Sequence, residues 1–356
     1  MMVALGVALA ACSGSSPSAN TSGSTAESMA PSSTAESMAP SEGAASLPAP
    51  DVTDLQIGLS VTETSQFAYQ LAKMAGIYDK YGLNVETSVF EGDAKALQAL
   101  VAGQLDAAGV GVSSDISSQV TDVPTVAVAA NAVILSDEMI CQSDIKTPED
   151  VKGATIAIST FGGTSNGSAI LFLKALGYTT DDATIKQIGG QSDRIAALEG
   201  GSVDCAVVDK AMHDTMMSEG FNSLVDLTTQ PLQWGRSALS FQKEFIDQHP
   251  DTVINVVAAA LEAQNMMWAD PDTAAQYYAD FVQIDLSEAK QLIADFQTIG
   301  NRTMMWNQDA FENPKEVLAT VNPDVANVDV TQAYDQSFLQ QLKDMGFYDQ
   351  LGIPTS

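Results

Sequence analysis

The chain has 356 residues, with 45 Asp and Glu against 15 Lys and Arg, so its formal net charge is −30. This negative field repels phosphate backbones and anionic headgroups, which argues against nucleic acid as a partner. Because 45% of the residues are hydrophobic, most of the chain can bury a core. It has two histidines without metal-ligand spacing and no GxxxxGK motif, so we expect no enzyme, no metal and no cofactor.

The first twelve residues predict a signal peptide that ends in a lipid anchor. Residues 1–11 form an apolar run too short to cross a bilayer as a helix. Residues 9–12 (LAAC) resemble the bacterial lipobox, in which the cysteine, here Cys12, is lipidated and the residues before it are removed. The segment departs from the usual signal-peptide pattern in one respect, because no Lys or Arg precedes the apolar run. A diacylglycerol and an added acyl chain together anchor a protein stably, so we expect extracytoplasmic attachment to the cell membrane.

Residues 13–50 are rich in Ser, Ala, Pro, Thr and Gly, and STAESMAPS occurs twice in tandem within them. Such a segment buries too little apolar surface to offset its ordering entropy, so we interpret it as a flexible tether. No later stretch is long and apolar enough for a transmembrane helix. After lipidation of Cys12, Cys141 and Cys205 remain; they form either a disulfide or two buried free thiols.

From residue 51 onward the pattern predicts strands that alternate with helices. In chain order we expect a strand at 54–60, a helix at 67–78, a strand at 83–90, a helix at 93–102 and a strand at 107–112. This alternation is typical of an α/β fold with a parallel sheet covered on both faces.

The same unit recurs about a hundred residues later. Residues 99–110 align with 197–208, and 56–60 align with 155–159 at nearly the same offset. We therefore expect two similar lobes, the first formed by 51–136 plus 240–356 and the second by 137–239. Ligands of open parallel sheets bind beyond the carboxyl ends of the strands, so two facing lobes would enclose one in a cleft.

The tail from about residue 241 is predicted to be mainly helical, with a long helix at 251–269 and shorter ones at 274–282, 287–299 and 331–345. We expect this tail to return to the first lobe. The chain would then cross between the lobes twice, near 133–139 and near 236–241.

Several motifs in order resemble one known family. They are Gly58, 72–86 (AKMAGIYDKYGLNVE), 90–106 (FEGDAKALQALVAGQLD), 145–153 (IKTPEDVKG) and 249–251 (HPD). The family comprises the nitrate, sulfonate, taurine and thiamine-pyrimidine binding proteins of ABC importers. The resemblance covers about residues 54–300. It implies a two-lobed type II periplasmic-binding fold that closes around a small molecule.

What the resemblance implies for function is a monomeric solute-binding protein whose partners are a small organic solute, sulfonate-like or pyrimidine-like, and an ABC permease. Two alternatives stay open at this point. One is a sensor lipoprotein that presents its ligand to a membrane receptor. The other is a pyrimidine-synthase-like enzyme on the same fold, which the scarcity of reactive His and Cys residues disfavours.

The most informative candidate site is the loop that opens the helix after the 155–159 strand. Its glycines let backbone N–H groups approach a ligand at a helix N-terminus, which carries partial positive charge. Hydroxyl groups add donors. The candidate residues there are Phe161, Gly162, Gly163, Thr164 and Ser165. An ordinary capped turn is the alternative.

Other candidates follow the remaining strand ends. Glu63 would suit an amine or a pyrimidine N–H, Arg236 could hold a sulfonate or carboxylate, and Trp234 could stack on a ring. The remaining candidates could contact the solute directly. Their alternative roles are those of a solvated loop acid, a helix cap or an ion pair across the hinge. These remaining candidates are Ser60, Thr62, Ser113, Ser114 and Asp209.

Replacing Cys12 tests the anchor. If the cysteine carries the acyl chains, Cys12→Ala should move the protein from the membrane fraction to the soluble fraction, because the chains supply the attachment. Fractionation followed by immunoblotting measures this, with Cys12→Ser as a second variant. Retention of both variants in the membrane fraction would contradict the anchor.

Overall fold

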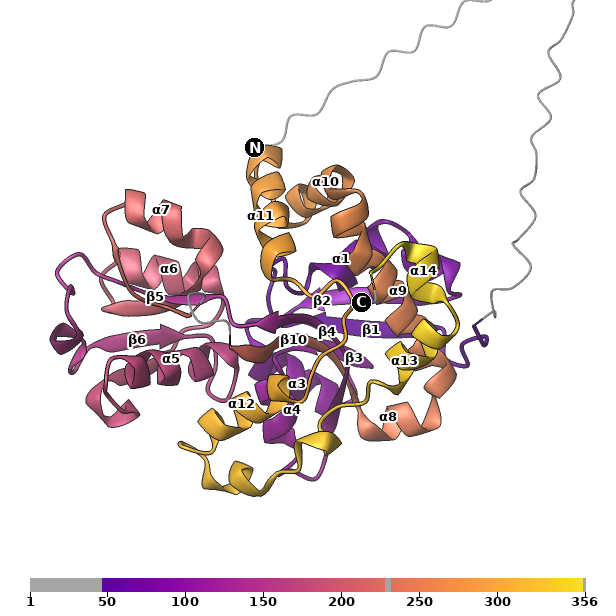
Figure 1. Cartoon of the computed structure of the whole chain (residues 1–356), viewed down its shortest axis with the longest axis horizontal. Helices are drawn as coiled ribbons and strands as arrows, with labels where there is room; N and C mark the ends of the chain where they lie inside the picture. Colours follow the sequence, from indigo (N-terminus) through magenta and orange to yellow (C-terminus); the bar gives the residue numbers. More distant parts are fainter. Residues whose placement is uncertain (1–46, 228–231, 355–356) are drawn as a thin grey trace, which may run out of the picture. The chain divides into compact units, whose positions relative to one another are not determined.

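The structure, a computed structural model, describes residues 47–227 and 232–354. Cys12 and the segment up to residue 46 lie outside these residues, as do most of the predicted tether and the whole predicted signal peptide. The described residues belong to one compact unit. They form an α/β fold with two sheets flanked by helices, as the sequence predicted (Figure 1). Each sheet has five strands and contains antiparallel as well as parallel pairs.

The first sheet is built mostly from the N-terminal part of the chain. Its middle strand β3 pairs in parallel with β1, and β1 pairs in parallel with β2. The later strand β10 inserts antiparallel between β3 and β4. In spatial order the strands are β2 (Asn84–Val89), β1 (Asp54–Leu59), β3 (Ala107–Val110), β10 (Gln233–Gln242) and β4 (Thr125–Ile134).

The second sheet repeats this arrangement. Here β6 pairs in parallel with β7 and β8, and β5 pairs antiparallel with β8 and β9. In spatial order the strands are β7 (Thr184–Gln187), β6 (Thr155–Ile158), β8 (Cys205–Asp209), β5 (Asp137–Cys141) and β9 (Asn222–Asp226). The aligned repeat segments therefore occupy matching places, because β1 corresponds to β6 and β3 to β8.

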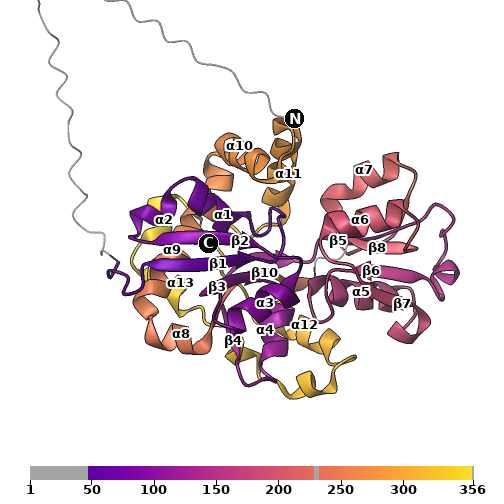
Figure 2. The same ribbon diagram turned by 180° about the vertical axis from the view of Figure 1, so that it is seen from behind.

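We call the first sheet with its helices the first lobe and the second sheet with its helices the second lobe. The first lobe contains α1 (Phe67–Met74), α2 (Ile77–Lys80), α3 (Asp93–Val101) and α4 (Val112–Ser118). The second contains α5 (Thr164–Ala175), α6 (Gln191–Glu199) and α7 (His213–Ser218). These helices lie beside the strands that precede and follow them (Figure 2).

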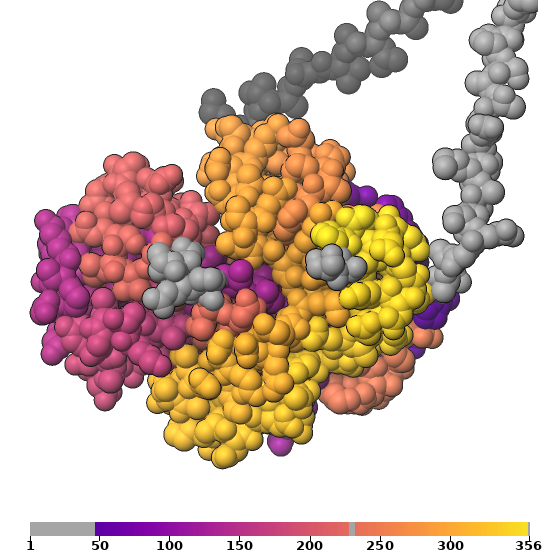
Figure 3. Space-filling view, in the orientation of Figure 1, coloured from indigo at the N-terminus to yellow at the C-terminus, as the bar shows by residue number. Residues whose placement is uncertain are grey.

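The C-terminal helices pack mainly on the first lobe. Helix α9 contributes most of its residues to the core cluster of that lobe and contacts α1 and α13. The orange and yellow residues in Figure 3 include this region. These helices are α8 (Lys243–Gln248), α9 (Pro250–Ala269), α10 (Pro271–Val282), α11 (Leu286–Ile299), α12 (Asp309–Leu318), α13 (Ser337–Asp344) and α14 (Phe347–Leu351).

Two features at the ends of the lobes differ from the expected boundaries. Leu47 packs against the core of the first lobe, and Asn255 donates a hydrogen bond to the carbonyl of Pro48, so ordered packing begins before residue 51. The chain enters the second sheet between Ile134 and Asp137 and joins the first sheet again at Gln233. This return precedes the expected 236–241 because Gln233 already pairs with Ile134.

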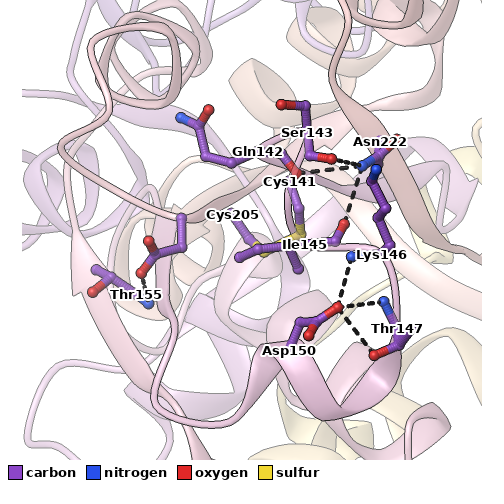
Figure 4. Close-up of a disulfide and its surroundings, with 11 residues drawn as sticks. Cys141, Gln142, Ser143, Ile145, Lys146, Thr147, Asp150, Thr155, Cys205 and Asn222 are labelled. Carbon is purple, nitrogen blue, oxygen red and sulfur yellow. Dashed lines mark hydrogen bonds between the residues drawn. A yellow bond between two sulfur atoms is a disulfide. The ribbon is translucent and has the colours of Figure 1, made fainter.

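A disulfide joins the two central antiparallel strands of the second sheet (Figure 4). Cys141 on β5 and Cys205 on β8 are register partners and are completely buried. The side-chain amide of Asn222 donates to backbone carbonyls of the loop that follows β5. Of the two alternatives left by the sequence, the structure has the disulfide.

No helix among the described residues is long and apolar enough to cross a membrane.

A buried carboxylate links α4 to the first sheet. Asp115 accepts hydrogen bonds from Thr125 on β4 (2.7 Å) and from Ser240 on β10 (2.9 Å). Its side chain is completely buried, and this burial raises the pKa of Asp115 to about 7. Desolvation disfavours the charged form of the carboxyl group. The hydrogen bonds from the two hydroxyl groups favour the charged form and only partly offset the desolvation.

This raised pKa predicts a pH dependence of stability. Between about pH 4 and pH 7 the folded state keeps the proton of Asp115 that the unfolded state has lost, so Asp115 lowers stability as pH rises. Asp115→Asn removes this dependence. The free energy of unfolding of the variant minus that of the native protein should rise by up to about 1.4 kcal/mol per pH unit in this window. Urea unfolding measures it, with the exposed Asp181→Asn as control. A difference independent of pH would contradict the assignment.

Candidate functional site

A small polar cavity of about 40 Å³ lies between the two lobes at the carboxyl ends of their strands. This is the position at which open α/β sheets bind ligands. Both lobes supply its lining. From the first lobe come Ser60, Val61, Glu63, Ser65, Gln66, Asp93 and Arg236, and from the second come Asp137, Ser159, Thr164, Ser165 and Arg194.

Matching loops of the repeat form two of its walls. Gln66 bonds the backbone N–H of Ser60 through its side-chain oxygen (2.8 Å), which fixes the loop after β1. In the second lobe the hydroxyl of Ser165 accepts from the backbone N–H of Ser159 (2.8 Å), which fixes the loop after β6. In each lobe, a side chain at the start of the next helix therefore holds the end of the strand in place.

Asp93, the first residue of α3, connects the lobes. Its carboxylate accepts from the hydroxyl of Ser60 (2.5 Å) and from the backbone N–H of Gly111 (3.3 Å), both in the first lobe. It also accepts a hydrogen bond from the backbone N–H of Thr164, the first residue of α5 in the second lobe. A carboxylate of the first lobe thus occupies the N-terminus of a second-lobe helix, where negative charge is favoured.

Glycines permit this close approach of the lobes. A Cβ atom on Gly111 would lie 2.1 Å from the hydroxyl oxygen of Thr164. A Cβ on Gly92 would lie 2.7 Å from the Cγ2 of Thr160, and Gly92 also has a positive φ of 103°. Side chains at these positions would therefore separate the two walls.

Arg236 on β10 is the centre of a buried ion cluster. Its Nη2 lies 3.0 Å from Glu63 in the first lobe. In the second lobe the same nitrogen lies 2.6 Å from Asp209 and 3.5 Å from Asp137. Asp209 also accepts from Ser136 (3.0 Å), and Asp137 accepts from Ser168. One guanidinium group therefore holds carboxylates of both lobes together.

Arg194 is the second buried cation of the cavity. Its Nε donates to the carbonyl of Val207 (2.8 Å) and its Nη1 to the carbonyl of Gly189 (2.7 Å). Burial lowers the pKa of Arg194, while Glu63 and Asp137 act in the opposite direction. The backbone carbonyls fix this guanidinium at the cavity wall, and its remaining N–H groups are left to other acceptors.

Burial dominates the electrostatics of the carboxyl groups. It raises the pKa of Glu63, Asp93 and Asp137, and Arg236 counteracts the effect at Glu63 and Asp137. Burial also disfavours charge on Arg236, but the nearby carboxylates, Asp209 foremost, outweigh it and raise the pKa of Arg236. Keeping these groups ionised in a closed cleft therefore depends on their mutual pairing.

The structure brings together part of the set predicted from the sequence. Ser60, Glu63, Thr164, Ser165 and Arg236 line the cavity, and Asp209 contacts Arg236. The other predicted residues are not among its lining residues. They are Thr62, Ser113, Ser114, Phe161, Gly162, Gly163 and Trp234.

Among these, Trp234 differs most from the expected role. Its indole is completely buried in a cluster with Leu135, Ile170 and Val317, so the structure gives it no free face for stacking on a ring. Gly167 makes room for it, since a Cβ there would lie 2.4 Å from the indole. Phe161, in contrast, is 59% exposed.

The sequence did not single out Asp93, Asp137 or Arg194. Asp93 was interpreted only as part of a helix start, although it follows Gly92 in the way that Gln191 follows Gly190 in the second lobe. Comparing matching places of the repeat marks this helix start, but it does not show that the side chain of Asp93 contacts the other lobe. No comparable signal marks Asp137 or Arg194, because their roles arise from contacts between distant segments.

A larger groove of about 600 Å³ lies between α11 of the first lobe and the segment 209–215 of the second (Figure 3). Lys210 and His213 line this groove, and both pair with Glu138 (2.7 Å from His213), whose side chain is completely buried behind them. Asp209 lines the groove and also contacts Arg236. Among the described residues, no group of His, Cys, Asp and Glu side chains could hold a metal ion.

Comparison with known proteins relates this site to one family. The sequence model of the NMT1-like family matches residues 48–282, which include all the lining residues of the cavity. The taurine-binding periplasmic protein of Escherichia coli is 27% identical over 222 residues, which cover 60% of this chain and 68% of that protein.

Solved structures share the fold at low sequence identity. The periplasmic nitrate-binding protein NrtA of Synechocystis superposes with a TM-score of 0.69 at 15% identity, covering 87% of this chain and 93% of its own. The alkanesulfonate-binding protein SsuA of Xanthomonas axonopodis, bound to MOPS, gives 0.66 at 16% identity, covering 82% of this chain and 99% of its own.

The ion cluster makes Arg236 a test of the site. Arg236→Gln leaves Glu63, Asp137 and Asp209 without their shared cation, so the free energy of unfolding should fall by about 3 kcal/mol. Arg302→Gln is the matched control, because Arg302 bonds the neutral oxygens of Asn265 and Gly352 and should cost only about 1 kcal/mol. Chemical denaturation measures both, and equal losses would contradict the role given to Arg236.

Proposed function

We propose that this chain, which belongs to the NMT1-like family, is the solute-binding component of an ABC importer. It captures a small organic solute between its two lobes, without chemical change to the solute, and presents it to a permease in the membrane. The observation that carries the proposal is the polar cavity whose lining comes from both lobes. The relative that binds taurine supports the same class of function.

The mechanism that we propose is closure around the solute. Two chain crossings join the sheets, between Ile134 and Asp137 and between Asp226 and Gln233. Domain closure of this kind needs only a few connecting residues to change their backbone angles. A solute that contacts both walls binds the closed form more tightly, so it shifts the population toward that form.

The cellular setting belongs to the same proposal. Lipidation at Cys12 and the tether that follows it would hold a monomeric protein outside the cytoplasm, near the permease. The disulfide between Cys141 and Cys205 supports this setting, because disulfides persist in oxidising compartments.

A glycine substitution tests closure. A thermal-shift screen of small sulfonates, amines, amino acids and pyrimidines should identify a solute that raises the melting temperature, because ligands stabilise the state that they bind. Gly111→Ala places a methyl group against Thr164 of the other lobe, and the φ of −72° at Gly111 accommodates alanine. Its affinity for that solute should fall at least about tenfold, a loss of about 1.4 kcal/mol.

Gly190→Ala is the matched control. Gly190 precedes α6, and a Cβ there would make only an ordinary contact of 3.7 Å with Asp193. Calorimetric titration should give this variant the affinity of the native protein. Failure of every solute to stabilise the protein, or equal affinity of the two alanine variants, would refute capture by closure.

A further inference from the structure

We infer that the solute enclosed by this cleft carries a positively charged N–H group, such as a protonated amine, amidine or guanidine, and is not a sulfonate, nitrate or carboxylate anion. The inference rests on the proposed function and names its class of solute. It follows from the charges at the cavity, from the donors available to them and from the group that occupies the helix N-terminus.

Carboxylates outnumber cations at the cavity. Glu63, Asp93 and Asp137 line it, and Asp209 belongs to the same ion cluster. Arg194 and Arg236 are the cations among the lining residues. The cavity lining and the ion cluster together therefore contain four carboxylates and two guanidinium groups. An anionic solute would add to this excess of negative charge, whereas a cationic solute would reduce it.

Three carboxylates share a single nitrogen of Arg236. Its Nη2 carries two hydrogens but approaches oxygens of Glu63, Asp137 and Asp209. The contact with Asp137, at 3.5 Å, is the longest of the three. Arg194 directs two of its N–H groups to backbone carbonyls instead. A charged N–H group on the solute would give Asp137 a nearer cationic partner than the nitrogen at 3.5 Å.

The usual place for an anion is already filled. The N-terminus of α5, a helix of 12 residues, is where the backbone N–H groups of the second lobe would hold negative charge. The carboxylate of Asp93 occupies it by accepting from the N–H of Thr164, and Asp93 is 7% exposed. A sulfonate would have to displace Asp93 and remain beside its charge.

The cost of closing the cleft favours the same class of solute. Burial raises the pKa of Glu63, Asp93 and Asp137, so closure pays a desolvation penalty for each ionised carboxylate. A cation within hydrogen-bond distance recovers part of this penalty, because opposite charges attract strongly where water is excluded.

One buried donor adds a second requirement. Arg236 is only 9% exposed. Within the described part of the chain, its Nε is buried and has no hydrogen-bond acceptor. A neutral oxygen or nitrogen of the solute can satisfy it, because an unmade buried hydrogen bond costs free energy. The solute that fits best therefore combines a charged N–H group with a neutral acceptor.

A matched panel tests the charge class. Its sets share a carbon skeleton and differ in the terminal group: ethanolamine, isethionate and taurine, then propylamine, propanesulfonate and 3-aminopropanesulfonate, with agmatine and acetamidine as further cations. Thermal shift and calorimetric titration of the full chain measure binding. We expect a cation to bind at least tenfold more tightly than the sulfonate and the zwitterion of its skeleton.

The outcomes separate this inference from the proposed function. The inference would be overturned if a sulfonate or zwitterion bound more tightly than the cation of its skeleton, or if solutes bound but no cation did. Capture by closure would then still stand. A panel and a wider solute screen that both give no binding would overturn the two proposals together.

A charge-neutral substitution locates the effect. Glu63→Gln keeps the shape of the side chain and should weaken binding of the cation at least tenfold. Glu91→Gln removes the same charge from an exposed residue that pairs with Lys95, and it should leave binding unchanged within twofold. An equal effect of both variants would overturn the assignment, because the loss would then come from total charge and not from the cavity.

Discussion

The closed cleft depends on one guanidinium group. Arg236 contacts Glu63 of the first lobe together with Asp137 and Asp209 of the second. Without this cation three carboxylates, each at most 19% exposed, would lose their partner, which costs more free energy than a pair at the surface ever supplies. Arg236 can reach all three because it lies near the start of β10, where the chain has just returned from the second lobe to the first. The topology and the electrostatics of the cleft thus meet in one side chain.

Small residues complement that charge contact. Gly92 and Gly111 let the walls approach so closely that Asp93 reaches the first turn of α5. The approach is polar, since hydroxyls, carboxylates and backbone N–H groups line it. Polar walls can part and rehydrate at lower cost than apolar ones, whose exposure water opposes. A cleft of this composition suits reversible opening better than a fixed apolar core would.

The sequence predicted the parts that repeat. The segments 56–60 and 155–159 became matching strands, and Glu63 and Arg236 were candidates because they follow a strand end and a crossing. It could not predict Asp93 acting across the lobes, since a helix start looks the same whether its side chain caps its own helix or another. The stacking role predicted for Trp234 does not match its burial, for a related reason. Its burial depends on the space left by Gly167, a residue 67 positions away that no local pattern connects to it.

The same distinction applies to charge. The formal net charge of −30 is a sum over the whole chain, and charges at the surface are screened within about 8 Å at physiological ionic strength. It therefore says little about what the cleft can hold. Inside the cavity water is largely excluded, so the excess of carboxylates over guanidinium groups acts at short range and with little screening. Substitution of a few lining residues can therefore change which solute charge a protein of this fold selects, while its sheets, crossings and core stay as they are.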